Sequence, residues 1–391
     1  MKEPATNIWH RYDAANRGHG VLVIYTGGTI GSMPRDPLDP HSPLVVVDWT
    51  EFRRRTSSLS ERLEDGRRNQ RYIGFNVDGC SLTPVDSCDI GPRYWVEIAR
   101  VIADSYDHYE GFVVLHGTDT MVYTASALSF MLANLGKPLI LTGAQIPHLG
   151  SVRNDALQNL LTALFMANPR FSDLPVVPEV GIFFHDALLR GNRTRKVNAS
   201  GFRAFSSPNH PPLATAGESI DVNERVLRRH DPALPLRTRL QVEPNVVAIH
   251  FFPGMEQGFL LPHILADESL RGVVLMAYGA GTVPGDERVL RAIEDAVGRG
   301  VVAVAVTQCG GGRVHLRRYQ ASARLLQAGV VSGIDITPEA ALVKLMVLLG
   351  DPGLRPEEAA NLMQQDMAGE MTPRTPGAAV AGAAPTAERR W

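Results

Sequence analysis

This sequence has few cysteines, no long apolar run and almost no net charge. Three cysteines occur in 391 residues, and no two of them form a Cys-x-x-Cys pair. An odd number of cysteines cannot all pair within one chain, which suits a reducing compartment. No stretch approaches the ~18 apolar residues of a membrane span, and residues 1–20 lack the apolar core of a signal peptide. We therefore expect a cytoplasmic protein with no membrane contact.

The charge balance gives no indication of a nucleic-acid partner. Lys and Arg number 39 and Asp and Glu number 41, which leaves a formal net charge of −2. The basic runs at residues 53–55 and 228–230 are short and typical of a solvated surface. Hydrophobic residues make up 44% of the chain, and 391 residues are too many for one ordinary core. We expect two domains of unequal size.

Short apolar runs alternate with longer helical patterns, which favours an α/β fold. The run at residues 112–115 is typical of a strand buried on both faces of a parallel sheet. Similar strand signals occur at residues 21–25, 72–77, 139–142, 180–184, 246–252, 273–277 and 301–307. Helical patterns occur at residues 49–63, 93–103, 120–135, 151–166 and 340–349, the last after the cap candidate Thr337. We predict a larger N-terminal domain with a mostly parallel sheet flanked by helices, plus a smaller C-terminal α/β domain.

Changes in composition indicate the domain boundaries. We expect a polar lead-in at residues 1–19, an N-terminal domain at 20–215, an irregular linker at 216–245 and a C-terminal domain at 246–371. Residues 372–391 are rich in alanine, proline and glycine, so we expect disorder there. Residues 32–44 carry four prolines and should form an irregular surface loop, a natural lid.

A turn after the strand at residues 112–115 carries groups suited to chemistry. In open α/β sheets ligands bind at the carboxyl ends of the strands, and Thr118 and Asp119 lie at such an end. A threonine hydroxyl needs a neighbouring base to become a nucleophile. Asp119 could anchor that base or bind a substrate ammonium. The alternative is that one of the two residues only caps the helix that begins near Thr120.

Three further residues have both a chemical and a plain interpretation. Thr29 lies between small residues that let a ligand approach the backbone, or else in a merely tight or phosphate-binding turn. Lys196 accepts a proton only if burial or positive neighbours lower its pKa, and otherwise belongs to an exposed basic loop. Cys309 has no evident catalytic partner, which favours a structural or effector-site cysteine.

In combination the Thr-Gly-Gly-Thr-Ile and His-Gly-Thr-Asp-Thr turns resemble those of the L-asparaginase family, above all its cytoplasmic type I members. The matching segments follow the family's order between residues 20 and 371, at residues 25–31, 86–87, 116–121, 142–147, 190–196 and 307–309. The resemblance implies hydrolysis of the side-chain amide of L-asparagine to L-aspartate and ammonia, without a metal or cofactor. It also implies a homo-oligomer, either a tight dimer or a tetramer, with sites at the subunit interface.

The resemblance also implies roles for individual residues. Thr29 matches the nucleophile that forms an acyl-enzyme ester, and a second catalytic group comprises Thr118, Asp119 and Lys196. Many members have a catalytic tyrosine in the loop at residues 32–44, which contains none here, and Tyr319 is the candidate replacement. The implied substrate-binding residues are Gly28, Ser87, Cys88, Gly117, Thr118 and Asp119. Thr307 and Cys309 match an effector site for asparagine.

Other functions stay open at this point. A glutaminase, or an amidase that acts on a larger amide, would use the same groups. The missing loop tyrosine also fits a protein of another class, a catalytically weak sensor that binds asparagine without hydrolysing it.

Overall fold

The computed structural model describes residues 7–10, 20–36, 38–39, 41–56, 75–147, 153–318 and 320–373. The chain divides into two compact units, Met1–Gln241 and Val242–Trp391, each with its own sheet. The predicted fold class, a larger and a smaller α/β domain, is confirmed. Most of the expected lead-in and tail, together with Tyr319, lie outside the described residues.

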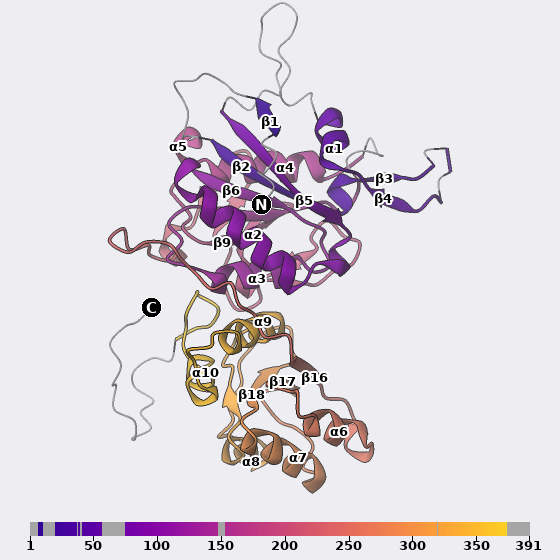
Figure 1. Ribbon diagram of the computed structural model, residues 1–391, viewed down its shortest axis with the longest axis vertical. Helices are drawn as coiled ribbons and strands as arrows, with labels where there is room; N and C mark the ends of the chain where they lie inside the picture. Colours follow the sequence, from indigo (N-terminus) through magenta and orange to yellow (C-terminus); the bar gives the residue numbers. More distant parts are fainter. Residues whose placement is uncertain are drawn as a thin grey trace, which may run out of the picture. The chain divides into compact units, whose positions relative to one another are not determined.

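A nine-stranded sheet forms the centre of the N-terminal unit (Figure 1). Its middle strands run parallel, in the order β5 (Val77–Val85), β2 (Val21–Gly27), β6 (Gly111–Leu115), β8 (Leu139–Thr142) and β9 (Val180–Phe184). Antiparallel strands extend both edges, namely β1 (Asn7–His10) beside β5, and β10 (Ala187–Arg190), β13 (Ala214–Ala216) and β14 (Ile220–Val222) beyond β9. Every residue of β2, β6, β8 and β9 is buried, as expected for apolar runs inside a parallel sheet.

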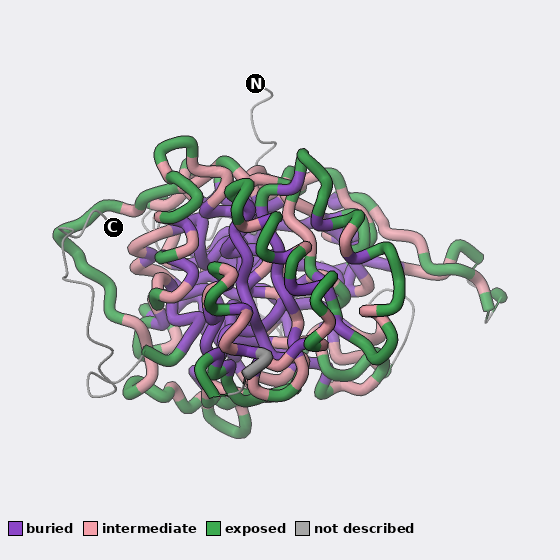
Figure 2. Tube along the Cα trace, turned by 90° about the horizontal axis from the view of Figure 1, so that it is seen from below, coloured by how far each residue is buried: buried purple, intermediate pink, exposed green. Residues whose placement is uncertain are grey.

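Helices cover both faces of this sheet. One face packs against α1 (Trp49–Arg55) and α4 (Ala156–Ala167), which is followed by the short α5 (Pro169–Ser172). The other face is covered by α2 (Pro92–Ser105) and α3 (Met121–Met131), which lie in front of the strands in Figure 1. Figure 2 shows the buried chain in purple at the interior, with exposed connections in green.

Several expected elements differ in the structure because distant segments pair. Only the ends of the loop expected at residues 32–44 differ, since β3 (Ser32–Pro34) pairs antiparallel with β4 (Leu44–Val46), and the described residues between the two strands are irregular as expected. The helix expected at residues 120–135 ends at Met131, because β7 (Leu132–Ala133) pairs with β15 (Arg237–Thr238). Of the strand expected at 72–77, residues 75 and 76 are not in a strand, Val77 begins β5, and residues 72–74 lie outside the described residues. Of the helix expected at 151–166, α4 begins at Ala156, and residues 151 and 152 lie outside the described residues. The segment expected as a linker contains β14 and β15, both paired within the N-terminal unit.

The C-terminal unit contains a parallel sheet of β16 (Val246–His250), β17 (Gly272–Ala277), β18 (Val302–Thr307) and β19 (Val331–Ser332). One face packs against α6 (Leu260–Ala266), α7 (Glu287–Gly298) and α8 (Gln320–Gln327), and the other against α9 (Pro338–Leu349) and α10 (Pro356–Leu362). The predicted cap of α9 is confirmed, because the Thr337 side chain accepts from the Ala340 nitrogen at 3.2 Å. No helix in the described ranges is long and apolar enough to cross a bilayer.

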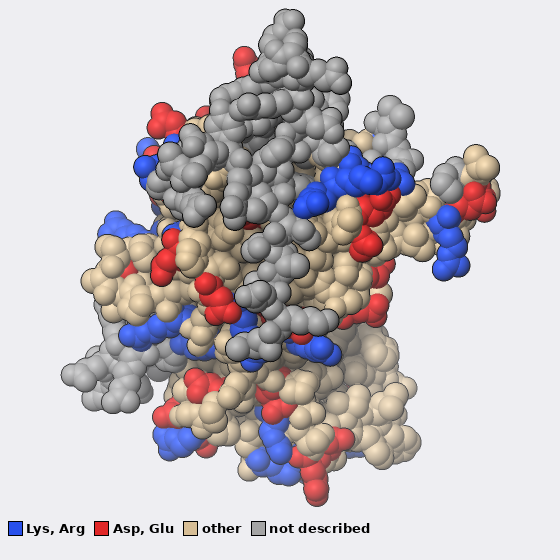
Figure 3. All heavy atoms as spheres, turned by 45° about the horizontal axis from the view of Figure 1, so that its top comes forward, with Lys and Arg blue, Asp and Glu red and all other residues tan. Residues whose placement is uncertain are grey.

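Surface charges of the two signs are interspersed over the face drawn in Figure 3. The basic run at residues 53–55 lies on α1, where Arg54 is 66% exposed and pairs with Glu51 at 2.7 Å. This run is a solvated, ion-paired helix face, as expected from the sequence.

Candidate active site

Turns that follow three parallel strands meet at one edge of the large sheet. β2 ends at Gly27 and leads into a 3-10 turn at Thr29–Gly31. β6 ends at Leu115 and leads into residues 116–120, while β5 leads into a 3-10 turn at Ser87–Asp89. Because parallel strands place their carboxyl ends together, the candidate residues of these turns share one edge.

Glycines bring the turns into direct contact. Gly28 has φ 79°, and a Cβ on it would lie 2.3 Å from the backbone nitrogen of Gly117. A Cβ on Gly117 would lie 2.7 Å from the side-chain oxygen of Ser87. Neither glycine can be replaced without moving a neighbouring turn. Thr29, Ser87 and Thr118 therefore lie on three turns that touch one another.

A short ribbon of β11 (Arg195–Lys196) and β12 (Phe205–Ser206) carries the lysine of the site. The Lys196 side chain is only 15% exposed. Its Nζ donates to Thr118 Oγ1 at 2.7 Å and to the Asp119 carboxylate at 2.5 Å. The interpretation of Lys196 as part of an exposed basic loop is therefore wrong.

The helix-capping interpretation of Thr118 and Asp119 does not match the structure. α3 begins at Met121, and its N-cap residue is Thr120, which makes no side-chain cap. The Thr120 hydroxyl instead donates to the Ser87 carbonyl at 2.6 Å and so connects two turns of the site. Thr118 is 6% exposed, whereas the Asp119 side chain is 68% exposed. Thr118 is held inside the protein, while Asp119 is accessible to a ligand.

Sequence reasoning missed Gln145 as a member of the site. The Thr118 hydroxyl donates to Gln145 Oε1 at 3.4 Å, and the Gln145 side-chain amide donates to the Gly201 carbonyl at 3.0 Å. The Gln145 backbone nitrogen donates to the Asp155 carboxylate at 3.0 Å. A signal was present, because Gln145 follows β8 at the same edge as the threonine turns. Because the Lys196 ammonium can only donate, the Thr118 oxygen accepts from it, and the Thr118 hydroxyl is left to donate to Gln145.

His116, the imidazole of the same turn, supports the backbone. Its Nδ1 lies 2.7 Å from the Gly117 carbonyl, which can only accept, so Nδ1 carries the proton. Its Nε2 accepts from the Thr124 hydroxyl at 2.8 Å, whose oxygen accepts from Trp95 Nε1 at 3.2 Å. Burial lowers the pKa of His116 to about 4, although the bond to Gly117 acts in the opposite direction. At neutral pH His116 is thus an uncharged support for the turn.

The remaining candidates lie in different surroundings. Cys88 is exposed, and desolvation together with two neighbouring carboxylates raises the pKa of its thiol, so it is not an activated nucleophile. In the C-terminal unit, the Thr307 hydroxyl donates to the Gly279 carbonyl at 2.6 Å and accepts from the Cys309 nitrogen at 3.1 Å. Thr307 and Cys309 therefore share one turn, in which the cysteine is exposed.

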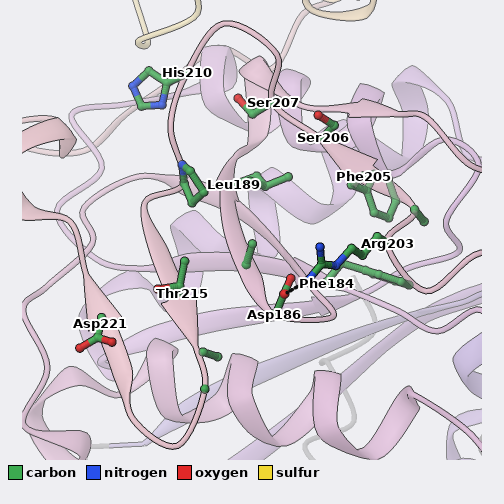
Figure 4. A pocket seen from close by; sticks show the side chains of 15 residues that line it. Phe184, Asp186, Leu189, Arg203, Phe205, Ser206, Ser207, His210, Thr215 and Asp221 are labelled. Carbon is green, nitrogen blue, oxygen red and sulfur yellow. Dashed lines mark hydrogen bonds and ion pairs between the residues drawn. The ribbon is translucent and has the colours of Figure 1, made fainter.

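A separate hollow of about 580 Å³ lies beside the turn between β9 and β10 (Figure 4). Three of its charged or titratable groups, Asp186, Arg203 and His210, already have partners within the chain. Asp186 pairs with Arg203 at 2.8 Å, and His210 Nε2 lies 3.0 Å from the Arg190 guanidinium. None of the candidate site residues lines this hollow.

These features define a class of protein: a two-domain α/β chain in which one threonine turn meets a second threonine, a lysine and a carboxylate at the carboxyl edge of the larger sheet. Within the described residues, no group of three or more His, Cys, Asp or Glu side chains is placed to hold a metal ion. The chain belongs to the asparaginase family. The family models "Asparaginase, N-terminal" and "Glutaminase/Asparaginase C-terminal domain" match residues 20–228 and 245–363.

Individual relatives agree with this assignment. L-asparaginase 1 of Escherichia coli (strain K12) is 39% identical over 363 residues, which cover 90% of this chain and 98% of the relative. The crystal structure of L-asparaginase I from Vibrio cholerae matches with 38% identity and a TM-score of 0.75, covering 90% of this chain and 98% of that one. The 60 kDa lysophospholipase of Homo sapiens is 41% identical over 363 residues, and the chain spans 61% of its length.

Proposed function

We propose that this protein hydrolyses the side-chain amide of L-asparagine to L-aspartate and ammonia. One observation carries the proposal: the Thr29 turn abuts, through Gly28, the turn in which Thr118 accepts from Lys196. Membership of the asparaginase family and the relatives named L-asparaginase support the same reaction.

In the first half-reaction Thr29 is the nucleophile. Its side-chain oxygen attacks the amide carbon, and the carbonyl electron pair moves onto oxygen to give a tetrahedral oxyanion. Backbone N–H groups at the Thr118 turn stabilise this charge, as preorganised donors do. When the oxyanion collapses, the C–N bond breaks and the proton from the Thr29 hydroxyl leaves with ammonia. An ester on Thr29 remains.

In the second half-reaction water releases the product. Water attacks the ester carbon, a second tetrahedral oxyanion forms that carries the water oxygen in place of the amide nitrogen, and the C–O bond to Thr29 breaks. One water proton returns to the Thr29 oxygen, and the remaining OH becomes part of the aspartate carboxyl group. Thr118, which contacts both Lys196 and Gln145, orients this water.

Two polar groups and three backbone segments hold the substrate. Ser87 binds the α-carboxylate, and the accessible Asp119 carboxylate binds the α-ammonium with the oxygen that does not face Lys196. The backbone at Gly28, Cys88 and Gly117 completes the binding surface.

A substrate comparison tests the proposal. We expect ammonia release with the highest kcat/KM for L-asparagine among L-asparagine, D-asparagine and L-glutamine. A preference for L-glutamine would make the protein a glutaminase. Tight binding of L-asparagine in calorimetry without any release of ammonia would favour the alternative of a sensor. That alternative is suggested by the absence of a tyrosine from residues 32–44. Because the human relative is named a lysophospholipase, a lysophospholipid is a useful further test substrate. If the protein hydrolysed the lysophospholipid and released no ammonia from any amide, the proposal would be contradicted.

We further propose that the protein is a cytoplasmic homo-oligomer, a dimer or a tetramer. The three free cysteines fit a reducing compartment, and the resemblance to type I asparaginases supports the assembly. Sedimentation velocity of the purified chain should give at least twice the monomer mass, and a monomer would contradict the proposal.

The turn shared by Thr307 and Cys309 is the candidate effector site for asparagine. We expect Cys309→Ala to weaken any sigmoidal dependence of the rate on asparagine while leaving the rate at saturation within about twofold, because the residue lies outside the machinery of the reaction. Cys80→Ala, a change at another free cysteine, is the matched control. Unchanged cooperativity in Cys309→Ala would remove the effector assignment.

A further inference from the structure

Tyr25 is a completely buried residue of β2, close in sequence to the Thr29 turn. Its ring stacks on Phe52 with a centroid distance of 4.9 Å and lies 5.6 Å from the ring of Trp49, so α1 fixes its orientation. The hydroxyl donates to the Val47 carbonyl at 2.8 Å and lies 3.3 Å from the Gly31 carbonyl.

These two carbonyls mark the two ends of the β3–β4 hairpin. Gly31 ends the Thr29 turn and precedes β3, and Val47 follows β4. The ends are also tied directly, because the Val47 nitrogen donates to the Gly31 carbonyl at 2.9 Å. A Cβ on Gly31 would lie 2.0 Å from the Tyr25 hydroxyl oxygen, so the glycine makes room for the phenol. Tyr25, Gly31 and Val47 form one buried joint.

The joint connects the Thr29 turn to the packed core. Within the turn the Gly31 nitrogen, at 3.0 Å, and the Ser32 hydroxyl, at 2.9 Å, both donate to the Gly28 carbonyl, and the Gly28 nitrogen donates to the Val85 carbonyl of β5 at 3.1 Å. Tyr25 adds a contact from a side chain that α1 holds rigidly. Burial raises the pKa of the phenol, and the Asp48 charge adds to the effect, so the group stays protonated and acts as a donor.

We propose that Tyr25 is a positioning residue, whose hydroxyl holds the Thr29 turn and the base of the β3–β4 hairpin in the arrangement needed for attack on the amide. The inference rests on the proposed function, in which Thr29 is the nucleophile. The phenol does not touch the substrate and acts through Gly31. Because Ser87 and Asp119 bind the substrate from other turns, losing the hydroxyl affects the chemical step more than substrate binding.

Tyr25→Phe tests the proposal, because it keeps the ring and removes only the hydroxyl. We expect kcat for L-asparagine to fall about ten- to a hundredfold, as for a misplaced reacting group, with KM changed by less than about threefold. We also expect hydrogen exchange at the Val47 amide to become about tenfold faster or more, because the joint opens more often.

Tyr106→Phe is the matched control. The Tyr106 hydroxyl accepts from the Gly136 nitrogen at 2.7 Å. Tyr106 precedes β6 and Gly136 precedes β8 in the sequence, so this bond lies at the amino ends of the strands, opposite the candidate site. The Tyr106→Phe variant should have kcat, KM and a Val47 amide exchange rate within about twofold of wild type. Equal kinetics and equal Val47 exchange in the two variants would overturn the proposal. If the wild-type protein releases no ammonia, the proposed function fails, and the Val47 exchange still decides whether Tyr25 holds the joint.

Discussion

Thr29→Ala is expected to lower kcat for L-asparagine by at least about a thousandfold, since removing a covalent nucleophile removes the whole acyl-transfer route. Thr118→Ala should cause a loss of similar order, because no hydroxyl then lies between Lys196 and Gln145. The two variants differ in one respect. In Thr118→Ala the ester on Thr29 should accumulate and be visible as an added mass on the intact protein, whereas Thr29→Ala cannot form it.

Two control variants separate chemistry from folding. Thr29→Ser keeps the nucleophilic oxygen and should retain measurable turnover. Thr26→Val removes a hydroxyl three positions earlier that donates to the Leu115 carbonyl at 2.8 Å, so it should reduce stability by about 1–3 kcal/mol with ammonia release preserved. Wild-type turnover in both Thr29→Ala and Thr118→Ala would show that the nucleophile lies elsewhere.

The parts of the fold that could be predicted from the sequence have local signals. Residues 112–115 form an unbroken apolar run, and the strand there is completely buried. Thr337 precedes a proline and an apolar periodic segment, and its side chain caps α9 as predicted. In both cases a few adjacent residues determine the conformation, because burial of one strand or the cap of one helix depends on neighbours in the sequence.

The parts that could not be predicted depend on contacts between distant segments. β7 ends the helical pattern after Met131 only because β15 pairs with it from about a hundred residues away. The sequence predicts a strand at residues 72–77, whereas β5 spans Val77–Val85. In β5 polar and apolar residues alternate, so no continuous apolar run marks the strand. The positioning role proposed for Tyr25 has no sequence signal beyond its place in a buried strand.

The candidate site shows the same division. Thr118 and Asp119 could be named from the turn alone, but the sequence left capping and catalysis equally open. From the sequence alone Lys196 resembles an exposed basic residue. In the structure the ribbon of β11 and β12 places its ammonium against the Thr118 hydroxyl. Gln145 was missed because its part in the site depends on the Gly201 carbonyl, which lies 56 residues away in the sequence.

The buried ion pair of Lys344 and Glu370 gives the largest expected effect on stability. Both side chains are 0% exposed, and Lys344 Nζ contacts Glu370 Oε1 at 2.5 Å. The lysine also donates to the Gln365 carbonyl at 2.6 Å, and the carboxylate accepts from the Ala368 nitrogen at 2.7 Å. Lys344→Met leaves an unpaired buried carboxylate, so we expect the free energy of unfolding of the C-terminal unit to fall by about 3–5 kcal/mol. Urea titration followed by circular dichroism measures the loss.

The matched control is a pair of the same charges at the surface. Arg291 and Glu287 lie 3.3 Å apart on α7 with side chains 72% and 52% exposed, so Arg291→Met should leave the free energy of unfolding nearly unchanged. If Lys344→Met is no more destabilising than Arg291→Met, the buried pair of Lys344 and Glu370 does not stabilise the C-terminal unit.

The dependence of this stability on pH follows from Glu370. Burial alone would raise the pKa of its carboxyl group, but the Lys344 ammonium and the backbone N–H donors outweigh burial and hold the pKa below its usual value. A carboxyl group whose pKa is lowered by folding contributes stability above its unfolded pKa of about 4.3, and loses that contribution as the pH falls through the folded value. The stability difference between wild type and Glu370→Gln should therefore be full at pH 7 and shrink as the solution is acidified below about pH 4. A difference that stays constant down to pH 3 would mean that the destabilisation comes from repacking around residue 370 and not from the lost charge.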